Sequence, residues 1–491
     1  MRELIATSYD SAVHTDESLL YKHKLIDPVS LSNNLTYLYG KDSDMFPLTF
    51  MSQGQGGMKS IKPKELNDTQ YTYDIMGRMK HTSKVVSLSN TSNTKPGLGF
   101  TPFDVIMEDN WFHKMYSATS PDGMHQVRVQ TEGQLIGAKQ YKYTFMIMGG
   151  DPTEYITLDN FLNGKTWVMG ATSVASTLSD GTTSNQMFPG KMTNQFGFHR
   201  YSKEITGNIG NKVTNIEFDL EGGGKTNLWM PFEMELWEKE RRQLNEEDLW
   251  WSKYNRDSNG VVTLLDADSG KPIPKGAGVK EILCSFGQYD TYGATLTKAK
   301  FDGILSSIFS NRVDDTPMEI VLYGGQGARA MFHNAIMSDA ISNNYFTPLG
   351  EQVITGGIYM TYGKYFNQYK TIDGKILTVK TANLFDHGTD AERQRANGEM
   401  YNGLPLMSYT MVALDQSKTN NGERNIQMVC EKGREVITGI YRGLTPLPGC
   451  WGAISGELLS DKKDLASYEV MTSDGIAITN ATTSFWMDMK L

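Results

Sequence analysis

Cysteine is scarce in this sequence of 491 residues. Cys284, Cys430 and Cys450 lie far apart and form no CxxC pair, so we expect buried, reduced thiols in place of a disulfide framework or a zinc site. The histidines show no HxH or HxxxH spacing, which argues against a structural metal ion. We therefore expect neither a metal nor a cofactor.

Long apolar runs and long basic runs are also missing. No segment approaches the roughly 18 apolar residues that a membrane-spanning helix requires, so no membrane partner is expected. The first twenty residues lack the apolar core of a secretory signal. A net charge of -9 without any run of Lys and Arg disfavours dedicated nucleic-acid binding. These absences predict a protein that is made, or assembled, in a cytoplasm.

Two glycine-rich motifs mimic nucleotide-binding loops, but both are incomplete. The segment Gly222–Thr226 reads GGGKT between a strand and a helix, yet the full phosphate-loop pattern requires glycine where Asp219 stands. The segment Gly325–Ala330 fits the dinucleotide pattern GxGxxA, but a second buried strand does not follow it. Both segments are better explained as tight connections between a strand and a helix.

Other candidate catalytic residues are isolated. His333 is expected to pack in a core, and the acidic run Glu246-Glu247-Asp248 is expected to be solvated. No combination of nucleophile, base and orienting group emerges from the sequence. We therefore predict no catalytic residues and no enzyme activity.

The segment 228–254 carries the strongest structural signal. It contains four of the eight tryptophans, and Pro231 fits the first turn of a helix. Glu235–Lys239 and Glu238–Arg242 form i,i+4 pairs in the favourable order. A helix of this length would run roughly 40 Å. The pattern predicts a long spine helix that contacts several parts of the protein.

The region before this helix is rich in strand patterns. Residues 124–148 alternate polar and apolar side chains and predict two strands joined near Gly133 or Gly137. The Ser/Thr/Gly-rich segment 171–197 predicts an exposed loop. A strand at 212–220 then leads into the helix. This arrangement favours a protruding β-hairpin or loop domain.

The second half of the chain mixes helices and strands. A helix is predicted at 297–312, a buried strand at 318–324 and a helix at 328–340. Asp373-Gly374, flanked by strand-forming runs, is the clearest hairpin signal. A strand pair is predicted at 406–414 and 424–430, followed by a strand-like C-terminus. The fold class is therefore α+β.

The order of these parts resembles the major capsid proteins of tailed bacteriophages, most like those of crAss-like phages. MEIVLYGGQGARAMFHNAI looks like the axial-domain segment of that family, and YFNQYKTIDGKILTVKTANLFD looks like its late sheet hairpin. LPGCWGAIS adds to the likeness. The resemblance implies the tailed-phage capsid fold, with an N-terminal arm, an extended β-hairpin loop, a long spine helix, an axial domain and a peripheral β-sheet, together with an insertion.

The resemblance also implies domain boundaries along the chain. These are an N-terminal arm at 1–60, the start of the peripheral domain with connecting loops at 61–123, an extended loop at 124–226 with an insertion near 150–200, the peripheral domain with the spine helix at 227–312, an axial domain with sheet hairpins at 313–460, and a C-terminal strand returning to the peripheral domain at 461–491.

The implied function is that of a major capsid protein that self-assembles into hexamers and pentamers. These would form an icosahedral head around double-stranded DNA, which is held by proximity and without sequence specificity. Implied partners are portal, scaffolding and head-decoration proteins. The location would be the virion, after assembly in the host cytoplasm. The residues proposed for contacts between subunits are Tyr141, Tyr143, Phe145, Glu238, Arg241 and Arg242.

Two alternatives remain open on the sequence alone. The protein could be another virion structural protein, such as a tail or head-decoration protein with similar glycine and strand content. It could also be an enzyme, with a nucleotide bound at Gly222–Thr226 or a polysaccharide cleaved by carboxylates.

Overall fold

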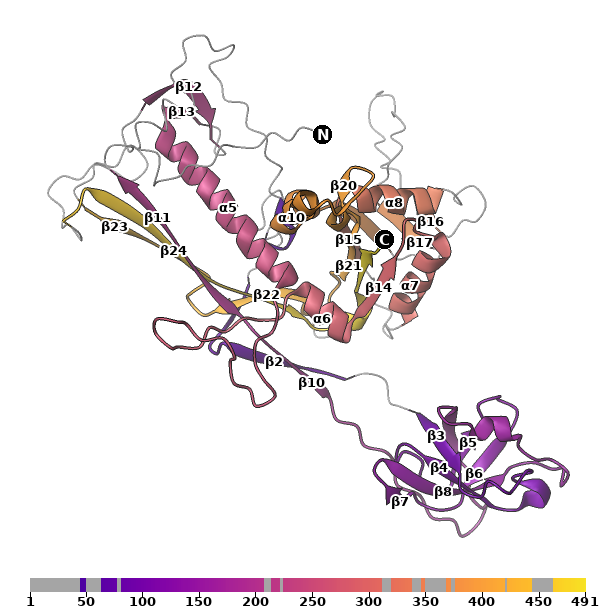
Figure 1. The fold of residues 1–491 in the computed structure, drawn as a ribbon. Coiled ribbons are helices and arrows are strands. Elements are labelled where there is room, and N and C mark those ends of the chain that lie inside the picture. The colour runs from indigo at the N-terminus through magenta and orange to yellow at the C-terminus, as the bar shows by residue number, and fades with distance from the viewer. Residues whose placement is uncertain are drawn as a thin grey trace. The chain divides into compact units, whose positions relative to one another are not determined.

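The structure is a computed structural model, shown in Figure 1. It divides into two compact units, of which residues 74–191 form one and residues 1–73 with 192–491 form the other. Of the predicted N-terminal arm, only residues 45–49 are described. The described residues are 45–49, 63–76, 81–206, 213–220, 224–310, 319–337, 346–348, 368–371, 376–419, 422–443 and 462–491.

The unit formed by residues 74–191 is a small β-barrel. Its strands run in the order β4-β3-β9-β5-β6-β8-β7, and a further pairing of β4 with β8 closes a ring of strands from which only β7 is excluded. The 3-10 helices η1 (Leu98–Phe100) and η2 (Leu158–Phe161) lie between strands. The strands are β3 (Thr82–Leu88), β4 (Phe103–Met107), β5 (Tyr116–Thr119), β6 (Gln126–Val129), β7 (Gln134–Gly137), β8 (Gln140–Ile147) and β9 (Thr166–Thr172).

Every second side chain of the strands points inward and fills the interior of this barrel. On β8, Tyr143, Phe145 and Ile147 are 0%, 0% and 4% exposed, because every second side chain of a strand points to the same face. They pack in one cluster with Phe112 and Trp167. The predicted turn near Gly137 is confirmed by the β7–β8 hairpin. The strands in 124–148 nevertheless belong to a barrel and not to an extended ribbon, because two strands alone could not bury these aromatic rings.

Two further strands carry the chain into and out of the barrel. β2 (Gln70–Ile75) precedes it, and β10 (Gly190–Gln195) follows it, and these two strands pair with each other. The predicted exposed loop of 171–197 corresponds to residues 173–189, which have no regular secondary structure and are mostly exposed. The points at which the chain enters and leaves the barrel unit therefore lie close together.

In the other unit, a peripheral sheet is organised around one long strand. β24 (Leu465–Ile478) pairs along one edge with β11 (Gly197–Thr206), and along its other edge with β22 (Ile426–Glu431) and β23 (Val436–Arg442). β1 (Lys64–Leu66) adds to β22. The sheet thus combines strands from three distant parts of the sequence.

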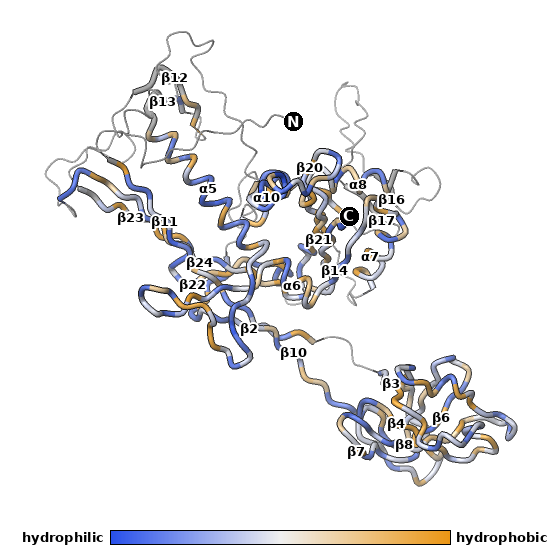
Figure 2. Tube along the Cα trace, in the orientation of Figure 1, coloured by the Kyte–Doolittle hydropathy of each residue, from blue (hydrophilic) through white to orange (hydrophobic). Residues whose placement is uncertain are grey.

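The spine helix, α5 (Trp229–Trp251), follows a hairpin of β12 (Val213–Asp219) and β13 (Lys225–Leu228). Figure 1 shows it running beside the peripheral sheet, and Figure 2 shows that many of its residues are hydrophilic. Trp237 meets Tyr468 of β24 edge to face, with ring centroids 5.6 Å apart. The predicted helix over 228–254 is confirmed to within three residues.

A second sheet lies at the centre of this unit and is buried on both faces. On β15 (Glu319–Gly324), Ile320 and Leu322 join one core, whereas Val321 and Tyr323 join another. This explains why the strand reads as a continuous apolar run. The sheet order is β14-β25-β21-β15-β18-β17-β16. The other strands are β14 (Gln288–Tyr292), β16 (Phe346–Pro348), β17 (Gln368–Thr371), β18 (Ile376–Thr381), β21 (Met411–Asp415) and β25 (Phe485–Met489).

Helices cover both faces of the central sheet. Phe301 and Leu305 of α7 and Phe332 of α8 pack into one core, while residues of α5 and α6 pack into the other. No helix of the described residues is both long enough and apolar enough to cross a membrane. The remaining helices and short strands are α6 (Val279–Phe286), α7 (Lys298–Ser310), α8 (Gln326–Met337), α9 (Leu384–His387), α10 (Thr389–Asn397), β19 (Met400–Tyr401), β20 (Leu404–Pro405), η3 (Leu406–Tyr409) and η4 (Ala481–Thr483).

Several sequence predictions for this unit can be checked directly. The hairpin around Asp373-Gly374 is confirmed by the pairing of β17 with β18, although the turn itself lies outside the described residues. The predicted pairing of 406–414 with 424–430 is wrong. β21 joins the central sheet and β22 joins the peripheral sheet, because each strand finds its partners far away in the sequence. The α+β class is confirmed, while the predicted domain boundaries stay predictions.

Candidate functional site on the spine helix

Three consecutive acidic residues near the end of α5 bond three different parts of the chain. Glu246, Glu247 and Asp248 point in different directions because successive residues of an α-helix are rotated by about 100°. The sequence predicts that all three are solvated, and this is wrong for Glu246 and Glu247, which are 0% and 9% exposed. We call these three residues the acidic cluster.

Glu246 holds the only described part of the N-terminal arm. One carboxylate oxygen accepts hydrogen bonds from the Leu48 amide (2.8 Å) and the Trp250 indole (3.0 Å). The other accepts from the amide and the hydroxyl of Thr49, at 2.9 Å and 2.5 Å. Burial raises the pKa of the Glu246 carboxyl, and these donors oppose that shift. Leu48 is itself fully buried beside Trp250, so the segment is anchored by apolar and polar contacts together.

Glu247 fixes the start of α10. The Thr389 amide donates to it at 3.0 Å, and the Thr389 hydroxyl donates to its second oxygen. A carboxylate at a helix N-terminus satisfies amides that have no partner within the helix and interacts favourably with the helix dipole. Gln243, one turn earlier on α5, donates to the same carboxylate at 3.1 Å. The spine helix thereby positions α10.

Asp248 bonds two basic side chains from other parts of the chain. The Lys275 ammonium and the His199 imidazole of β11 lie against its two oxygens, the latter at 3.4 Å. Burial would raise the pKa of Asp248, but the hydrogen bonds from His199 and Lys275 outweigh it and lower that pKa. The carboxylate form is therefore favoured, and it ties α5 to the peripheral sheet.

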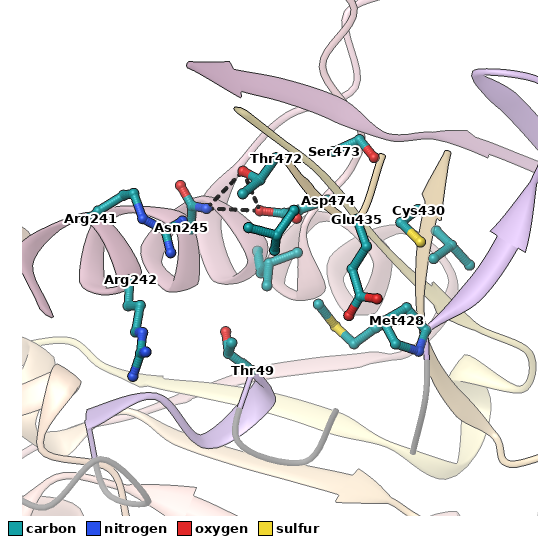
Figure 3. A pocket seen from close by; sticks show the side chains of 14 residues that line it. Thr49, Arg241, Arg242, Asn245, Met428, Cys430, Glu435, Thr472, Ser473 and Asp474 are labelled. Carbon is teal, nitrogen blue, oxygen red and sulfur yellow. Dashed lines mark hydrogen bonds between the residues drawn. The ribbon is translucent and has the colours of Figure 1, made fainter. Parts of the chain in front are cut away.

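Asn245, an uncharged residue of α5, links this helix to the peripheral sheet beside a small pocket. Its amide nitrogen donates to Thr472 (3.0 Å) and Asp474 (2.9 Å) of β24, and its oxygen accepts from Tyr201 of β11 at 2.8 Å. Figure 3 shows Asn245, Thr472 and Asp474 beside a pocket between α5 and the sheet. The volume of the pocket is about 50 Å³. The pocket is lined by Thr49, Pro63, Arg241, Arg242, Asn245, Leu249, Met428, Val429, Cys430, Glu435, Val436, Thr472, Ser473 and Asp474.

The predicted charged contact residues lie two turns earlier on the same helix. Arg241 and Arg242 both bond Glu238, at 2.5 Å and 3.2 Å. The Arg241 side chain is only 7% exposed, whereas those of Arg242 and Glu238 are 24% and 31% exposed. Mutual pairing is thus their role within the subunit. Lys239 pairs with Glu235 at 3.0 Å, which confirms the predicted i,i+4 pair.

The predicted aromatic contact residues belong to the barrel. Tyr143 and Phe145 are fully buried, so the prediction that their side chains contact another subunit is corrected. Tyr141 is partly buried and packs against the same core. Alternation along β8 explains the error, because the sequence pattern marks apolar positions but does not say whether their partner is the same chain or another.

The described residues of the two glycine-rich motifs have structural surroundings that differ from each other. Lys225 lies in β13, opposite Asp219 of β12, which differs from the loop geometry of a phosphate site; Gly222 and Gly223 lie outside the described residues. Gly325 immediately precedes α8, which begins at Gln326, and the Gln326 amide donates to Asp386 at 2.9 Å. His333 is buried in α8, as predicted. Within the described ranges, no group of three or more His, Cys, Asp or Glu side chains is arranged to hold a metal ion.

A comparison with protein families shows to which family this chain belongs. A family model described as Crassvirus major capsid protein matches residues 12–491. The chain belongs to the Crassvirus major capsid protein family. As a major capsid protein it forms the icosahedral shell of a phage virion, and its role is structural and not enzymatic. The match sets aside the alternatives of a tail or decoration protein and of an enzyme.

Comparisons with individual proteins add little to this assignment. No curated protein matches the chain. The structure of Microbacterium phage Oxtober96 is similar to the capsid protein at 7% identity and a TM-score of 0.35, covering 94% of this chain and 96% of that chain. The capsid structure of cyanophage P-SCSP1u is similar at 9% identity and a TM-score of 0.32, covering 65% and 80%. The mature capsid of bacteriophage PhiM1 gives 9% and 0.32, covering 65% and 79%.

Proposed function

We propose that the capsid protein assembles into hexamers and pentamers, which close an icosahedral head around double-stranded DNA in the host cytoplasm. Portal, scaffolding and head-decoration proteins would complete the particle. A net charge of -9 disfavours tight binding to DNA phosphates, so the genome would be enclosed without being held by specific contacts.

The acidic cluster is the observation that supports this proposal. One helix bonds the arm segment through Glu246, α10 through Glu247 and the peripheral sheet through Asp248. A subunit whose parts are fixed in this way can occupy many nearly identical positions, as the repeated interfaces of a symmetric assembly require. Small differences in geometry between these positions would then be accommodated at the contacts between subunits.

Four of the predicted contact residues remain candidates for those contacts. Tyr141, Glu238 and Arg242 are partly exposed, and Arg241 supports Arg242 through their shared partner Glu238. We propose that Glu238 and Arg242 exchange their mutual pairing for pairing with a neighbouring subunit. Partly exposed charges at the edge of an interface, such as these two, would affect the rate of assembly more than the stability of the shell.

Electron microscopy of the purified chain tests the proposed assembly. With rising protein concentration, class averages should show sixfold and fivefold rings and then closed shells. Particles formed in host cells should protect double-stranded DNA from nuclease. A small discrete oligomer at every concentration would contradict the proposal. Arg242→Ala should slow assembly, whereas Arg393→Ala, which removes an exposed arginine of α10, should leave the rate unchanged.

A further inference from the structure

One outer strand of the peripheral sheet, β23, carries partly exposed apolar side chains on both faces. On β23, Val436, Ile437, Ile440 and Tyr441 are 50%, 45%, 39% and 47% exposed. Among the described residues, β23 pairs with β24 alone, so its second backbone edge has no partner in this part of the chain. Such an edge is a template for pairing with another chain unless it is protected.

The register shows that the exposed side chains lie on opposite faces. Ile440 pairs with Tyr468 and Val436 with Thr472, and these two residues of β24 contact α5. Val436 and Ile440 therefore lie on the helix side, because directly paired residues share a face. Ile437 and Tyr441 lie on the other side. The helix thus covers the middle of the sheet and leaves its edge strand open.

The usual protections of an edge strand are missing here. The strand reads VITGIYR, with no proline and no charge until its last residue, and it forms no bulge in its pairing with β24. Natural edge strands are commonly blunted by proline, inward-pointing charges or bulges. From Val436 to Tyr441 the strand has no proline, charge or bulge that would oppose the addition of another strand.

We propose that β23 is an assembly edge, where a strand of a second copy of this chain adds to the peripheral sheet. The incoming strand would bond the free backbone edge and cover Ile437 and Tyr441 on one face and Val436 and Ile440 on the other. Val436 also lines the pocket of Figure 3, so the contact would extend to the spine helix. The inference rests on the proposed self-assembly and adds the surface that performs it.

The size of the surface favours a second copy as the occupant. Aromatic side chains bury about 150–250 Å² each and aliphatic ones less, so these four, which are nearly half exposed, leave on the order of 300 Å² open. A stable pair of proteins buries about 800 Å² on each partner. This edge alone is too small for a lasting dimer. It suits a weak contact that is repeated at every subunit of a shell, where many such contacts close together.

Charge substitutions on the two faces of β23 test this inference. Ile437→Lys and Ile440→Lys, alone and combined, should lower the yield of shells at least about tenfold, because each lysine would be desolvated in every contact. Both positions are exposed, so the melting temperature of the unassembled subunit should stay within about 2 °C of the wild type. Val168→Lys, at a residue of the barrel that is 44% exposed, is the matched control and should assemble normally.

Photo-crosslinking identifies the occupant. With p-benzoylphenylalanine at Tyr441, irradiated shells should yield a covalent dimer of this chain, and unassembled subunits should not. The same group at Arg200, which lies on β11 at the opposite edge of the sheet and has a side chain 77% exposed, should not crosslink. A crosslink from position 441 to a different protein, or full shell yield from the double variant, would overturn the inference. If the wild type itself formed no shell, the proposed self-assembly would fail first.

Discussion

A buried carboxylate is tolerated only when donors surround it, and Glu246 meets this condition with four. Its position also decides what it does. It lies on a helix and bonds an arm segment that is 198 residues away in sequence. A residue that looks like surface charge in the sequence thereby becomes the anchor of the arm.

Replacement of Glu246 tests the anchor. Glu246→Ala should destabilise the subunit by about 3 kcal/mol, since the Leu48 and Thr49 amides and the Trp250 indole would lose a charged acceptor. Urea unfolding followed by tryptophan fluorescence measures the change. Glu240→Ala, at an exposed position of the same helix, should shift stability by less than about 0.5 kcal/mol. Equal effects of the two variants would show that the arm contributes nothing at this site.

At the scale of elements, the glycines at the start of α8 allow close packing. A Cβ atom on Gly325 would lie 2.8 Å from the Ser408 carbonyl oxygen, and one on Gly327 would lie 2.7 Å from the Tyr409 ring. The Ser408 hydroxyl also accepts the Gly327 amide at 2.9 Å. The GxGxxA pattern therefore reflects contact between α8 and η3, which explains a nucleotide-like motif without a nucleotide.

Alanine substitutions distinguish close packing at these glycines from a general effect of glycine on backbone flexibility. Gly325→Ala and Gly327→Ala should each destabilise the subunit by about 2 kcal/mol, through overpacking against rigid neighbours. Gly303→Ala in the interior of α7, where a Cβ would meet no atom within 4 Å, should instead stabilise it by about 0.5–1 kcal/mol. Thermal unfolding of the three variants measures the differences. A loss at Gly303 as large as at Gly325 would contradict the packing explanation.

The elements also show how far sequence could predict this fold. The spine helix and α7 were predictable because capping, i,i+4 pairs and apolar spacing are local signals. Strand partners were not, because β24 pairs with β11 across more than 250 residues, and no local pattern specifies such a pairing. The burial of Glu246 and Glu247 could not be predicted for the same reason, since their donors Leu48, Thr49 and Thr389 come from segments that only the fold brings near. The alternating apolar residues of β8 can be recognised in the sequence, but the sequence does not show that they are buried within their own barrel.

At the scale of the whole molecule, the barrel of residues 74–191 has the properties of an inserted domain. It has its own core, and the chain enters and leaves through paired strands β2 and β10. A Cβ atom on Gly190 would lie 3.6 Å from the Ile75 carbonyl oxygen, so the two ends are adjacent. Adjacent ends allow a domain to be inserted into a host fold without disturbing either one.

Residues 74–191 should therefore fold when expressed alone, because the barrel closes without a strand from the rest of the chain. Far-UV circular dichroism should show a β-rich spectrum, and urea should unfold the fragment in a single cooperative transition. Within the fragment, Phe145→Ala should cost about 3–5 kcal/mol by opening a cavity in the core. Leu135→Ala, at a position of β7 that is 67% exposed, should cost less than about 0.5 kcal/mol. A fragment without a cooperative transition would show that the barrel depends on the host fold, whereas a Phe145→Ala fragment as stable as the unaltered fragment would contradict the role of Phe145 in the core.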